Sequence, residues 1–197
     1  VSLVTAVGGD VYGQGILDSC RELGIDMSLA RILPERRSST YLYVTDETGD
    51  MQIGIADMEI TECITPEYLA SRMDEINAFG AVVLDANLSA ESVEYAARHC
   101  TAPIIADPVS TAKAMRLVPV LDKLWAIKPN IYEAEKLTGE HDPEKAAAAL
   151  LDKGVKRVFI SLGEEGMLAA ERGSTVHMPR ELVTVVNTTG AGDAATS

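Results

Sequence analysis

The sequence has few cysteines and histidines and no long apolar run. Its three cysteines, Cys20, Cys63 and Cys100, are scattered and odd in number. That argues against a disulfide framework and favours reduced thiols in a cytoplasm. The cysteines and the three histidines show no metal-ligand spacing. No apolar segment approaches the roughly 20 residues that span a bilayer. We therefore expect a cytoplasmic protein without a membrane partner.

Positive charge is also scarce. Seventeen Lys and Arg residues face 30 Asp and Glu residues, which gives a formal net charge of -13. This balance argues against nucleic acid or an anionic membrane as the main partner. A small anionic ligand is still compatible, because backbone donors can hold it locally. A length of 197 residues and a hydrophobic content of 47% are ample for one globular domain with a sizeable core.

Apolar segments alternate with helical patterns along most of the chain. Residues 81–88 read as a nearly continuous apolar strand, as expected for one buried on both faces. Similar strands are predicted at 103–107, 125–128 and 155–162, with helices between them, for example around 112–124 and at 142–153. Repeated βα units predict an α/β fold with a mostly parallel central sheet and helices on both faces.

Two hairpins are expected to interrupt this alternation. Segments 40–45 and 51–56 are β-type and joined by a Gly-containing turn, and 167–170 and 175–178 form a similar pair. The first hairpin has two interpretations that the pattern does not separate. It is either a small second sheet that acts as a lid or dimer contact, or an edge hairpin of the main sheet.

The last stretch of the chain has the pattern of an anion site. A β-branched run at 183–186 stops at Asn187 and gives way to Gly190, Ala191 and Gly192, after which small residues open a helix. Unpaired N–H groups at such a turn, together with the helix dipole, attract anions. Asp193 in the first helical turn then favours phosphoryl transfer, with its carboxylate taking the acceptor's proton. The same stretch also fits the looser dinucleotide pattern G-x-G-x-x-A, so an oxidoreductase that uses a nicotinamide cofactor is the alternative.

Polar residues gather where the predicted strands end, the edge at which parallel sheets bind ligands. Asn130 and Glu133 form either a helix capping box alone or a pair that also faces Mg²⁺ beside a nucleotide phosphate. Asp107 is either a helix cap or a group that lines the pocket. Ser161, Gly163 and Gly166 stand at another strand end, and they allow either close approach of a nucleotide or a plain turn.

Taken together, three motifs resemble those of the ribokinase-like (phosphofructokinase-B-type) carbohydrate kinase family, in family order and over essentially the whole chain. They are residues 187–193, residues 128–139, and residues 7–10 with 23–26. Within the family, residues 39–42, 55–58 and 106–110 are most similar to the pseudouridine kinase group. The resemblance implies an ATP-dependent kinase that phosphorylates a sugar or nucleoside hydroxyl, with the 5′-hydroxyl of pseudouridine as the preferred acceptor.

The resemblance also implies roles for individual residues. Asp193 is the base, and Gly190, Ala191 and Gly192 form the anion hole. Asn130 and Glu133 serve Mg²⁺ and ATP, with the metal held directly or through water, while Ser161, Gly163 and Gly166 lie along the nucleotide. Thr40 and Asp107 contact the substrate. Residues 36–58 form a lid that covers the sugar and builds a homodimer. A potassium requirement does not follow, because Asn187 replaces a carboxylate that some members use.

We expect the chain to be truncated at both ends. Val1 opens the sequence in place of a methionine, and Ser197 follows Asp193 by only four residues. We therefore expect residues 1–197 to be an incomplete kinase domain with little activity by itself. Another sugar kinase of the family, resembling ribokinase or fructokinase, and a non-catalytic fragment are the remaining alternatives.

Overall fold

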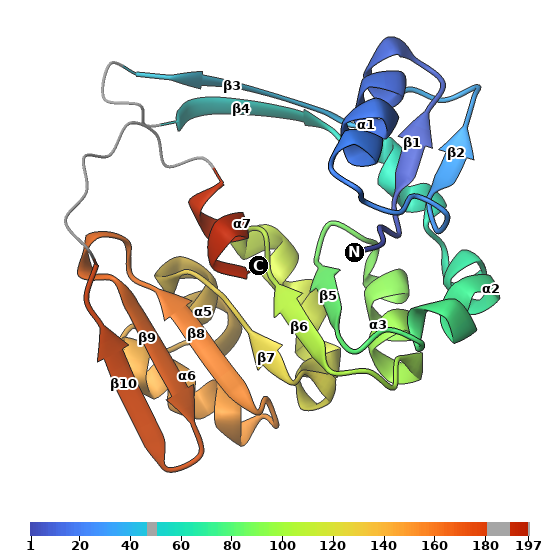
Figure 1. Ribbon diagram of the computed structural model, residues 1–197. Helices are drawn as coiled ribbons and strands as arrows, with labels where there is room; N and C mark the ends of the chain where they lie inside the picture. The colour runs from blue at the N-terminus through green and yellow to red at the C-terminus, as the bar shows by residue number, and fades with distance from the viewer. Residues whose placement is uncertain (47–50, 181–189, 197) are drawn as a thin grey trace. The chain divides into compact units, whose positions relative to one another are not determined.

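The computed structural model describes residues 1–46, 51–180 and 190–196 (Figure 1). Two compact units divide the chain, Val1–Arg72 and Met73–Ser197, and each is described by itself. The turn of the first predicted hairpin, the predicted strand at 183–186 and Asn187 lie outside the described residues. Within the described part of the chain, no helix has the length and apolar character needed to cross a membrane.

The first unit contains two small sheets. β1 (Ala6–Gly8) pairs in parallel with β2 (Arg31–Leu33), and α1 (Val11–Glu22) lies between them in sequence. Antiparallel pairing joins β3 (Thr40–Thr45) to β4 (Met51–Asp57), and the 3-10 helix η1 (Glu59–Cys63) follows. The first predicted hairpin is thus confirmed. Because β3 and β4 form a sheet of their own, its interpretation as an edge hairpin of the main sheet is wrong.

Helix α1 begins where its sequence predicts. The Asp10 carboxylate accepts a hydrogen bond from Gly13 N at 2.8 Å, which caps the helix. Asp10 also accepts bonds from the backbone N and the hydroxyl of Ser38, and the Ser38 hydroxyl accepts one from Gly8 N. These bonds hold the β1–α1 turn against the segment that enters β3. Gly8 is required there, because a Cβ would lie 2.5 Å from Arg36 O.

The second unit is built on a six-stranded sheet of order β10-β9-β8-β7-β6-β5. Four of its strands are parallel: β5 (Val82–Asp85), β6 (Ile104–Asp107), β7 (Ala126–Ile127) and β8 (Arg157–Ser161). β9 (Met167–Glu171) and β10 (Ser174–Met178) extend it as an antiparallel hairpin. The helical elements are α2 (Pro66–Ile76), which contains the boundary between the units, α3 (Ala90–His99), α4 (Thr111–Ala114), η2 (Met115–Lys123), α5 (Ile131–Thr138), α6 (Pro143–Asp152), η3 (Gly163–Glu165) and α7 (Ala191–Thr196). The predicted α/β class, the mostly parallel sheet and the second hairpin are confirmed.

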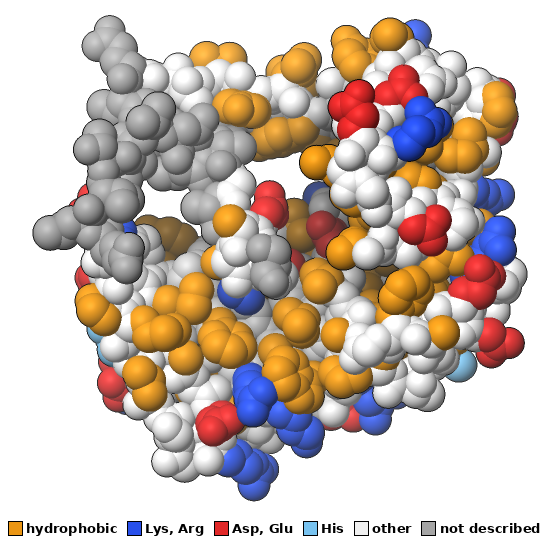
Figure 2. All heavy atoms as spheres, in the orientation of Figure 1, with side chains coloured by type: hydrophobic (Ala, Val, Ile, Leu, Met, Phe, Trp, Pro, Cys, Tyr) orange, Lys and Arg blue, Asp and Glu red, His pale blue; other side chains and the backbone are white. Residues whose placement is uncertain are grey.

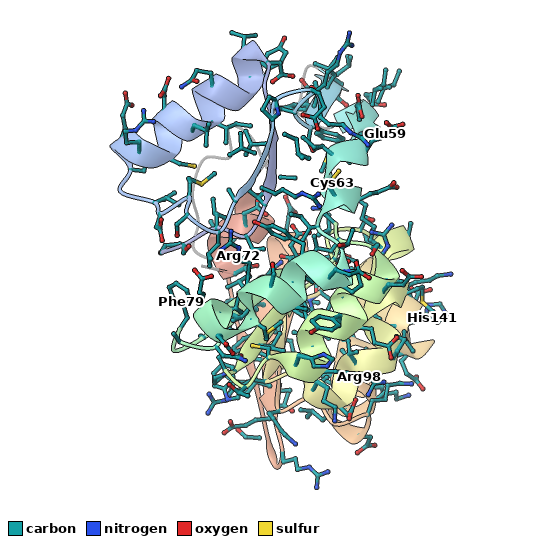
Figure 3. The ribbon with its side chains drawn as sticks, turned by 90° about the vertical axis from the view of Figure 1, so that its right-hand side faces the viewer. Glu59, Cys63, Arg72, Phe79, Arg98 and His141 are labelled. Carbon is teal, nitrogen blue, oxygen red and sulfur yellow. The ribbon has the colours of Figure 1, made fainter. Side chains whose placement is uncertain are left out.

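One face of this sheet carries the core. Alternate strand residues such as Leu84, Ala106 and Ile160 are at most 5% exposed and belong to one cluster with Val93 and Leu150 from the helices behind the sheet in Figure 1. Each fully buried aliphatic side chain of this kind contributes about 1.5–3 kcal/mol. The outer side of α3 is polar: Arg98, labelled in Figure 3, pairs with Glu94 at 2.8 Å.

The opposite face is more open in the described part of the chain. Apolar side chains gather there in Figure 2, and the face includes Val176 and Met178, which are 53% and 41% exposed. Helices on both faces of the sheet therefore stay a prediction for the whole domain.

Two predicted elements differ from the structure. Strand 81–88 is only Val82–Asp85, and Val83 is 58% exposed, so the expectation of a strand buried on both faces is wrong. β5 ends the sheet among the described strands, and the chain leaves it in a turn at Asp85–Asn87. The predicted helix around 112–124 is one α-helical turn followed by the 3-10 helix η2. Pro119 explains this, because proline has no N–H and clashes within a regular α-helix.

Candidate active site

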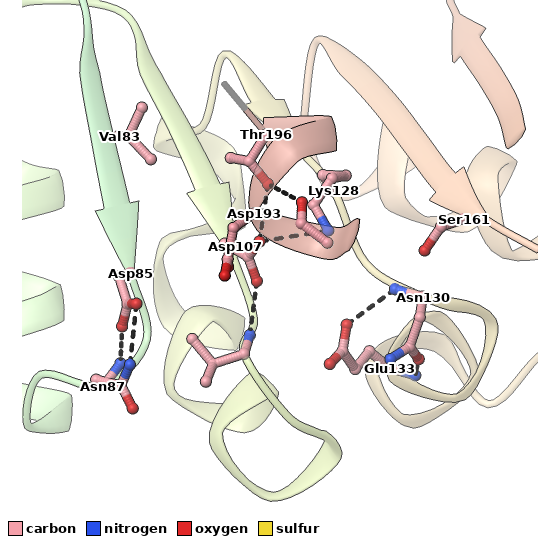
Figure 4. A pocket seen from close by; sticks show the side chains of 12 residues that line it. Val83, Asp85, Asn87, Asp107, Lys128, Asn130, Glu133, Ser161, Asp193 and Thr196 are labelled. Atoms are coloured by element: carbon pink, nitrogen blue, oxygen red, sulfur yellow. Dashed lines mark hydrogen bonds and ion pairs between the residues drawn. The ribbon is translucent and has the colours of Figure 1, made fainter. Parts of the chain in front are cut away.

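A cavity of about 710 Å³ opens at the carboxyl ends of β5, β6, β7 and β8 in the second unit (Figure 4). It is the place at which open α/β sheets bind ligands. The cavity is lined by Val83, Asp85, Asn87, Asp107, Val109, Lys128, Asn130, Glu133, Ser161, Gly192, Asp193 and Thr196.

The structure brings most of the predicted site residues together. Asp107, Asn130, Glu133, Ser161, Gly192 and Asp193 all line the cavity, and Gly190 and Ala191 lie at the start of the same helix, α7. Gly163 and Gly166 do not line it. Gly166 closes a turn instead: its φ is +93°, and a Cβ there would lie 2.1 Å from Met178 O, so a structural turn explains this glycine. Thr40 belongs to the first unit, on β3.

Asn130 and Glu133 form the predicted capping box at the start of α5. Asn130 Oδ1 accepts from Glu133 N at 2.9 Å, and Glu133 Oε2 accepts from Asn130 N at 2.8 Å. Glu133 is only 4% exposed, and this burial raises the pKa of its carboxyl above the ordinary value. The Asn130 N–H and Lys128 act in the opposite direction, while Asp107 adds to the rise. Among the described residues, Glu133 Oε1 has no hydrogen-bond partner, so the cap leaves one oxygen for a cation.

Asp107 connects three elements around the cavity (Figure 4). Its Oδ2 lies 3.3 Å from Lys128 Nζ and accepts a hydrogen bond from Thr196 Oγ1 at 2.9 Å. Its Oδ1 accepts from Val109 N at 2.8 Å. The carboxylate thereby ties the end of β7 and helix α7 to the end of β6. Asp107 thus lines the cavity, and Ser110 caps the helix α4 that follows.

Asp85, at the end of β5, is another carboxylate that lines the cavity. It accepts hydrogen bonds from Asn87 N at 2.5 Å and from Asn87 Nδ2 at 2.9 Å. Burial raises the pKa of Asp85, and the charge of Asp107 adds to that rise, while the bonds from Asn87 oppose it. Lys113 also contacts Asn87 Oδ1.

Sequence reasoning assigned no role to several residues that line the cavity, among them Val83, Val109, Lys128 and Thr196. Lys128 had a usable signal, because it directly follows a short buried strand and precedes Pro129 and Asn130. Thr196 had none, since its role depends on a hydrogen bond to Asp107, 89 positions earlier in the chain.

The cavity is strongly acidic. Asp85, Asp107, Glu133 and Asp193 face it, and Lys128 is its one cationic lining residue in the described ranges. No group of three or more Asp, Glu, His or Cys side chains is arranged as a metal site among the described residues. An anionic ligand therefore needs cations of its own to enter here, since like charges repel in a partly desolvated space.

Val109 holds a strained backbone conformation at the rim of this cavity. Its φ is 66°, in the left-handed region that β-branched residues avoid. We expect Val109→Asn to raise the free energy of unfolding by about 1 kcal/mol, because asparagine tolerates this region. Urea unfolding measures the change. Val118, which is similarly exposed but has no positive φ, is the matched control, and Val118→Asn should give no gain. An equal or lower stability of Val109→Asn contradicts the strain.

Comparison with known proteins indicates the family of this chain. The model of the pfkB family carbohydrate kinases matches residues 1–197. A pseudouridine kinase of Escherichia coli (strain K12) is 34% identical over 199 residues, which cover 98% of this chain and 64% of that protein. A crystal structure of ribokinase from Thermotoga maritima superposes with a TM-score of 0.87 at 25% identity and covers 98% of this chain and 64% of that one. An Escherichia coli protein solved in complex with ATP and Mg²⁺ has a TM-score of 0.84 at 20% identity, and the match covers 98% of this chain and 66% of that one.

The chain thus spans slightly less than two thirds of the length of these proteins. The family match covers every residue, and two of the three kinase motifs contribute lining residues to the acidic cavity: Lys128, Asn130, Glu133, Gly192 and Asp193. The match favours a kinase over the oxidoreductase alternative. The chain belongs to the pfkB family of carbohydrate kinases.

Proposed function

We propose that the whole protein transfers the γ-phosphoryl group of ATP to the 5′-hydroxyl of a nucleoside, with pseudouridine as the preferred acceptor. The observation that carries this proposal is the position of Asp193. Asp193 lines the same cavity as the Asn130–Glu133 pair and Asp107, although these residues lie far apart in the sequence. The 34% identity to a pseudouridine kinase and the similarity of residues 106–110 to that group support the acceptor.

In this proposal Asp193 orients the acceptor hydroxyl and takes its proton. The hydroxyl oxygen forms a bond to the γ-phosphorus as the bond from that phosphorus to the β-bridging oxygen breaks, and ADP leaves. Backbone N–H groups at Gly190–Gly192 face the charge that develops on the phosphoryl oxygens. Catalysis then consists of positioning and charge stabilisation, with general-base help from Asp193.

The residues present also fit a magnesium ion. Oxygen ligands suit Mg²⁺, and Glu133 offers an oxygen that its helix cap does not use, in a buried position where a negative charge benefits from a cation. When bound, the ion would neutralise phosphate charge that the four carboxylates otherwise repel. Asn130 fixes the Glu133 side chain through the capping box, so capping and metal binding are compatible. The complex of a structural relative with ATP and Mg²⁺ supports both cofactors.

We also propose that the β3–β4 hairpin forms a homodimer contact. Leu42, Val44, Ile53 and Ile55 share one face of this ribbon and are 59–65% exposed. An isolated two-stranded ribbon is marginally stable in water, and a contiguous aliphatic face favours association. Sedimentation of the whole protein as a monomer at micromolar concentration would speak against this contact. The substrate role of Thr40 stays a prediction from the family resemblance.

An acceptor panel tests the proposed function. The whole protein is incubated with ATP and Mg²⁺ and with pseudouridine, uridine, ribose, deoxyribose or fructose, and ADP release is followed. We expect the highest kcat/KM with pseudouridine. Turnover of ribose or fructose without pseudouridine would overturn the acceptor and leave the kinase in place. If none of the acceptors leads to ADP release, both the proposed acceptor and the proposed kinase activity lose their support.

A further inference from the structure

Lys128 is the one cationic side chain among the described residues that line the cavity, which four carboxylates also line. It is 5% exposed as a residue, although lysine is among the side chains least often buried. A buried ion pair is weak evidence of stabilisation, because desolvating two charges offsets most of their attraction. Stabilisation of the fold therefore does not by itself explain why the Lys128–Asp107 pair is buried.

The hydrogen bonding around this pair is uneven. Asp107 has three donors, since Val109 N, Thr196 Oγ1 and Lys128 Nζ all contact its carboxylate. Lys128 has three N–H donors, and among the described residues Asp107 is the acceptor that the structure gives it. Donors on the ammonium group thus remain for a ligand.

The ammonium group also lies beside the helix that carries Asp193. A Cβ built on Gly192 would be 3.5 Å from Lys128 Nζ, which places the charge against the first turn of α7. Figure 4 shows Lys128 and Asp107 close to this turn, with Glu133 across the cavity. Lys128 also lowers the pKa of Glu133, as a nearby cation does. The positive charge therefore lies beside the helix that carries the proposed base, and it acts on the proposed metal ligand.

We propose that Lys128 is a catalytic residue that contacts the phosphoryl group in transfer, and that Asp107 is the positioning residue that holds its ammonium group. This rests on the proposed function. The transferring group spreads negative charge over its equatorial oxygens, and a fixed cation stabilises that charge most when it is already in place. Lys128 takes no part in the proton transfer; the proton of the acceptor goes to Asp193, as above. Asp107 thereby acts through Lys128, whereas the sequence predicted a substrate contact.

Lys128→Met removes the charge and keeps the length of the side chain. In the whole protein we expect kcat to fall about 10²–10³-fold, the loss typical of one transition-state donor. The KM for the acceptor should stay within threefold. Lys128→Arg should recover part of the lost kcat, because it restores a cation. Lys136→Met, an exposed lysine on α5, is the matched control and should leave kcat unchanged.

Binding gives a second readout. Mg²⁺-ADP with aluminium fluoride mimics the phosphoryl group in transfer, whereas Mg²⁺-ADP alone lacks it. Calorimetry should show Lys128→Met weakening the aluminium fluoride complex at least tenfold, with Mg²⁺-ADP affinity within threefold. Equal weakening of both would assign Lys128 to general nucleotide binding and overturn the proposal.

The double variant Lys128→Met/Asp107→Asn controls for an unpaired buried charge. Lys128→Met leaves Asp107 without its cation, which can lower activity by destabilising the fold. We expect the double variant to fold like the wild type and to be no more active than Lys128→Met. Recovery of near wild-type kcat in the double variant, or a kcat within threefold of wild type in Lys128→Met, would overturn the proposal. A wild-type protein that transfers no phosphoryl group would instead overturn the proposed function.

Discussion

Asp193→Asn is expected to lower kcat about 10²–10⁴-fold and to leave the affinity for Mg²⁺-ATP within a few fold. Asparagine keeps the shape of the side chain but cannot take the proton of the acceptor hydroxyl. Asp193 is exposed on a six-residue helix, so the substitution removes no packed group and should not change the fold. Steady-state kinetics with ATP and pseudouridine, together with nucleotide titration, separate the two effects.

Asp85 supplies the matched control for this assignment. It is another carboxylate that lines the cavity, and the proposed mechanism gives it no proton to accept. Asp85→Asn should therefore lower kcat much less than Asp193→Asn. If Asp85→Asn lowers kcat more than Asp193→Asn does, the assignment of Asp193 as the base is wrong.

Glu133→Gln is expected to have two opposite effects. Metal-dependent turnover should fall about 10–100-fold, because the ligand that the helix cap positions loses its charge. At neutral pH the folded chain should become more stable, because the variant removes a buried carboxylate while glutamine still accepts from Asn130 N. A residue that only capped the helix would show no such metal effect.

The pH dependence of stability follows from the raised pKa of Glu133. Above that pKa the folded chain carries a buried negative charge that the unfolded chain leaves in water. As pH falls through the raised pKa, the folded state binds a proton first, so wild-type stability rises relative to the variant. Below the ordinary glutamate pKa the difference should vanish. Chemical unfolding of both chains between pH 4 and 8 measures it, and a difference independent of pH would contradict this role of burial.

Much of the fold was predictable because its determinants are local. The Asn130–Glu133 capping box requires residues three apart, and the structure forms both of its hydrogen bonds. Asp10 likewise caps α1 from the turn before it. Continuous apolar runs predicted the inner parallel strands, since both faces of such strands are at least partly covered.

The missed features depend on contacts between distant residues. Val83 is exposed because it lies on the face of the sheet opposite the core and lines the cavity, whereas its neighbour Leu84 is buried in the core, and the apolar run itself does not indicate this difference. The Lys128–Asp107 pair joins the ends of two neighbouring strands, so it requires the strand order. The positive φ of Val109 results from the turn after β6 and has no signal in residue type.

Phosphorus NMR of the reaction products tests the proposed phosphoryl transfer most directly. The whole protein is incubated with Mg²⁺-ATP and pseudouridine, and the spectra are recorded without proton decoupling. We expect ATP to be consumed with the appearance of ADP and of one phosphomonoester whose signal is split by two methylene protons, as a 5′-phosphate requires. Consumption of ATP to give only ADP and inorganic phosphate, or no consumption at all, would contradict phosphoryl transfer to the 5′-hydroxyl.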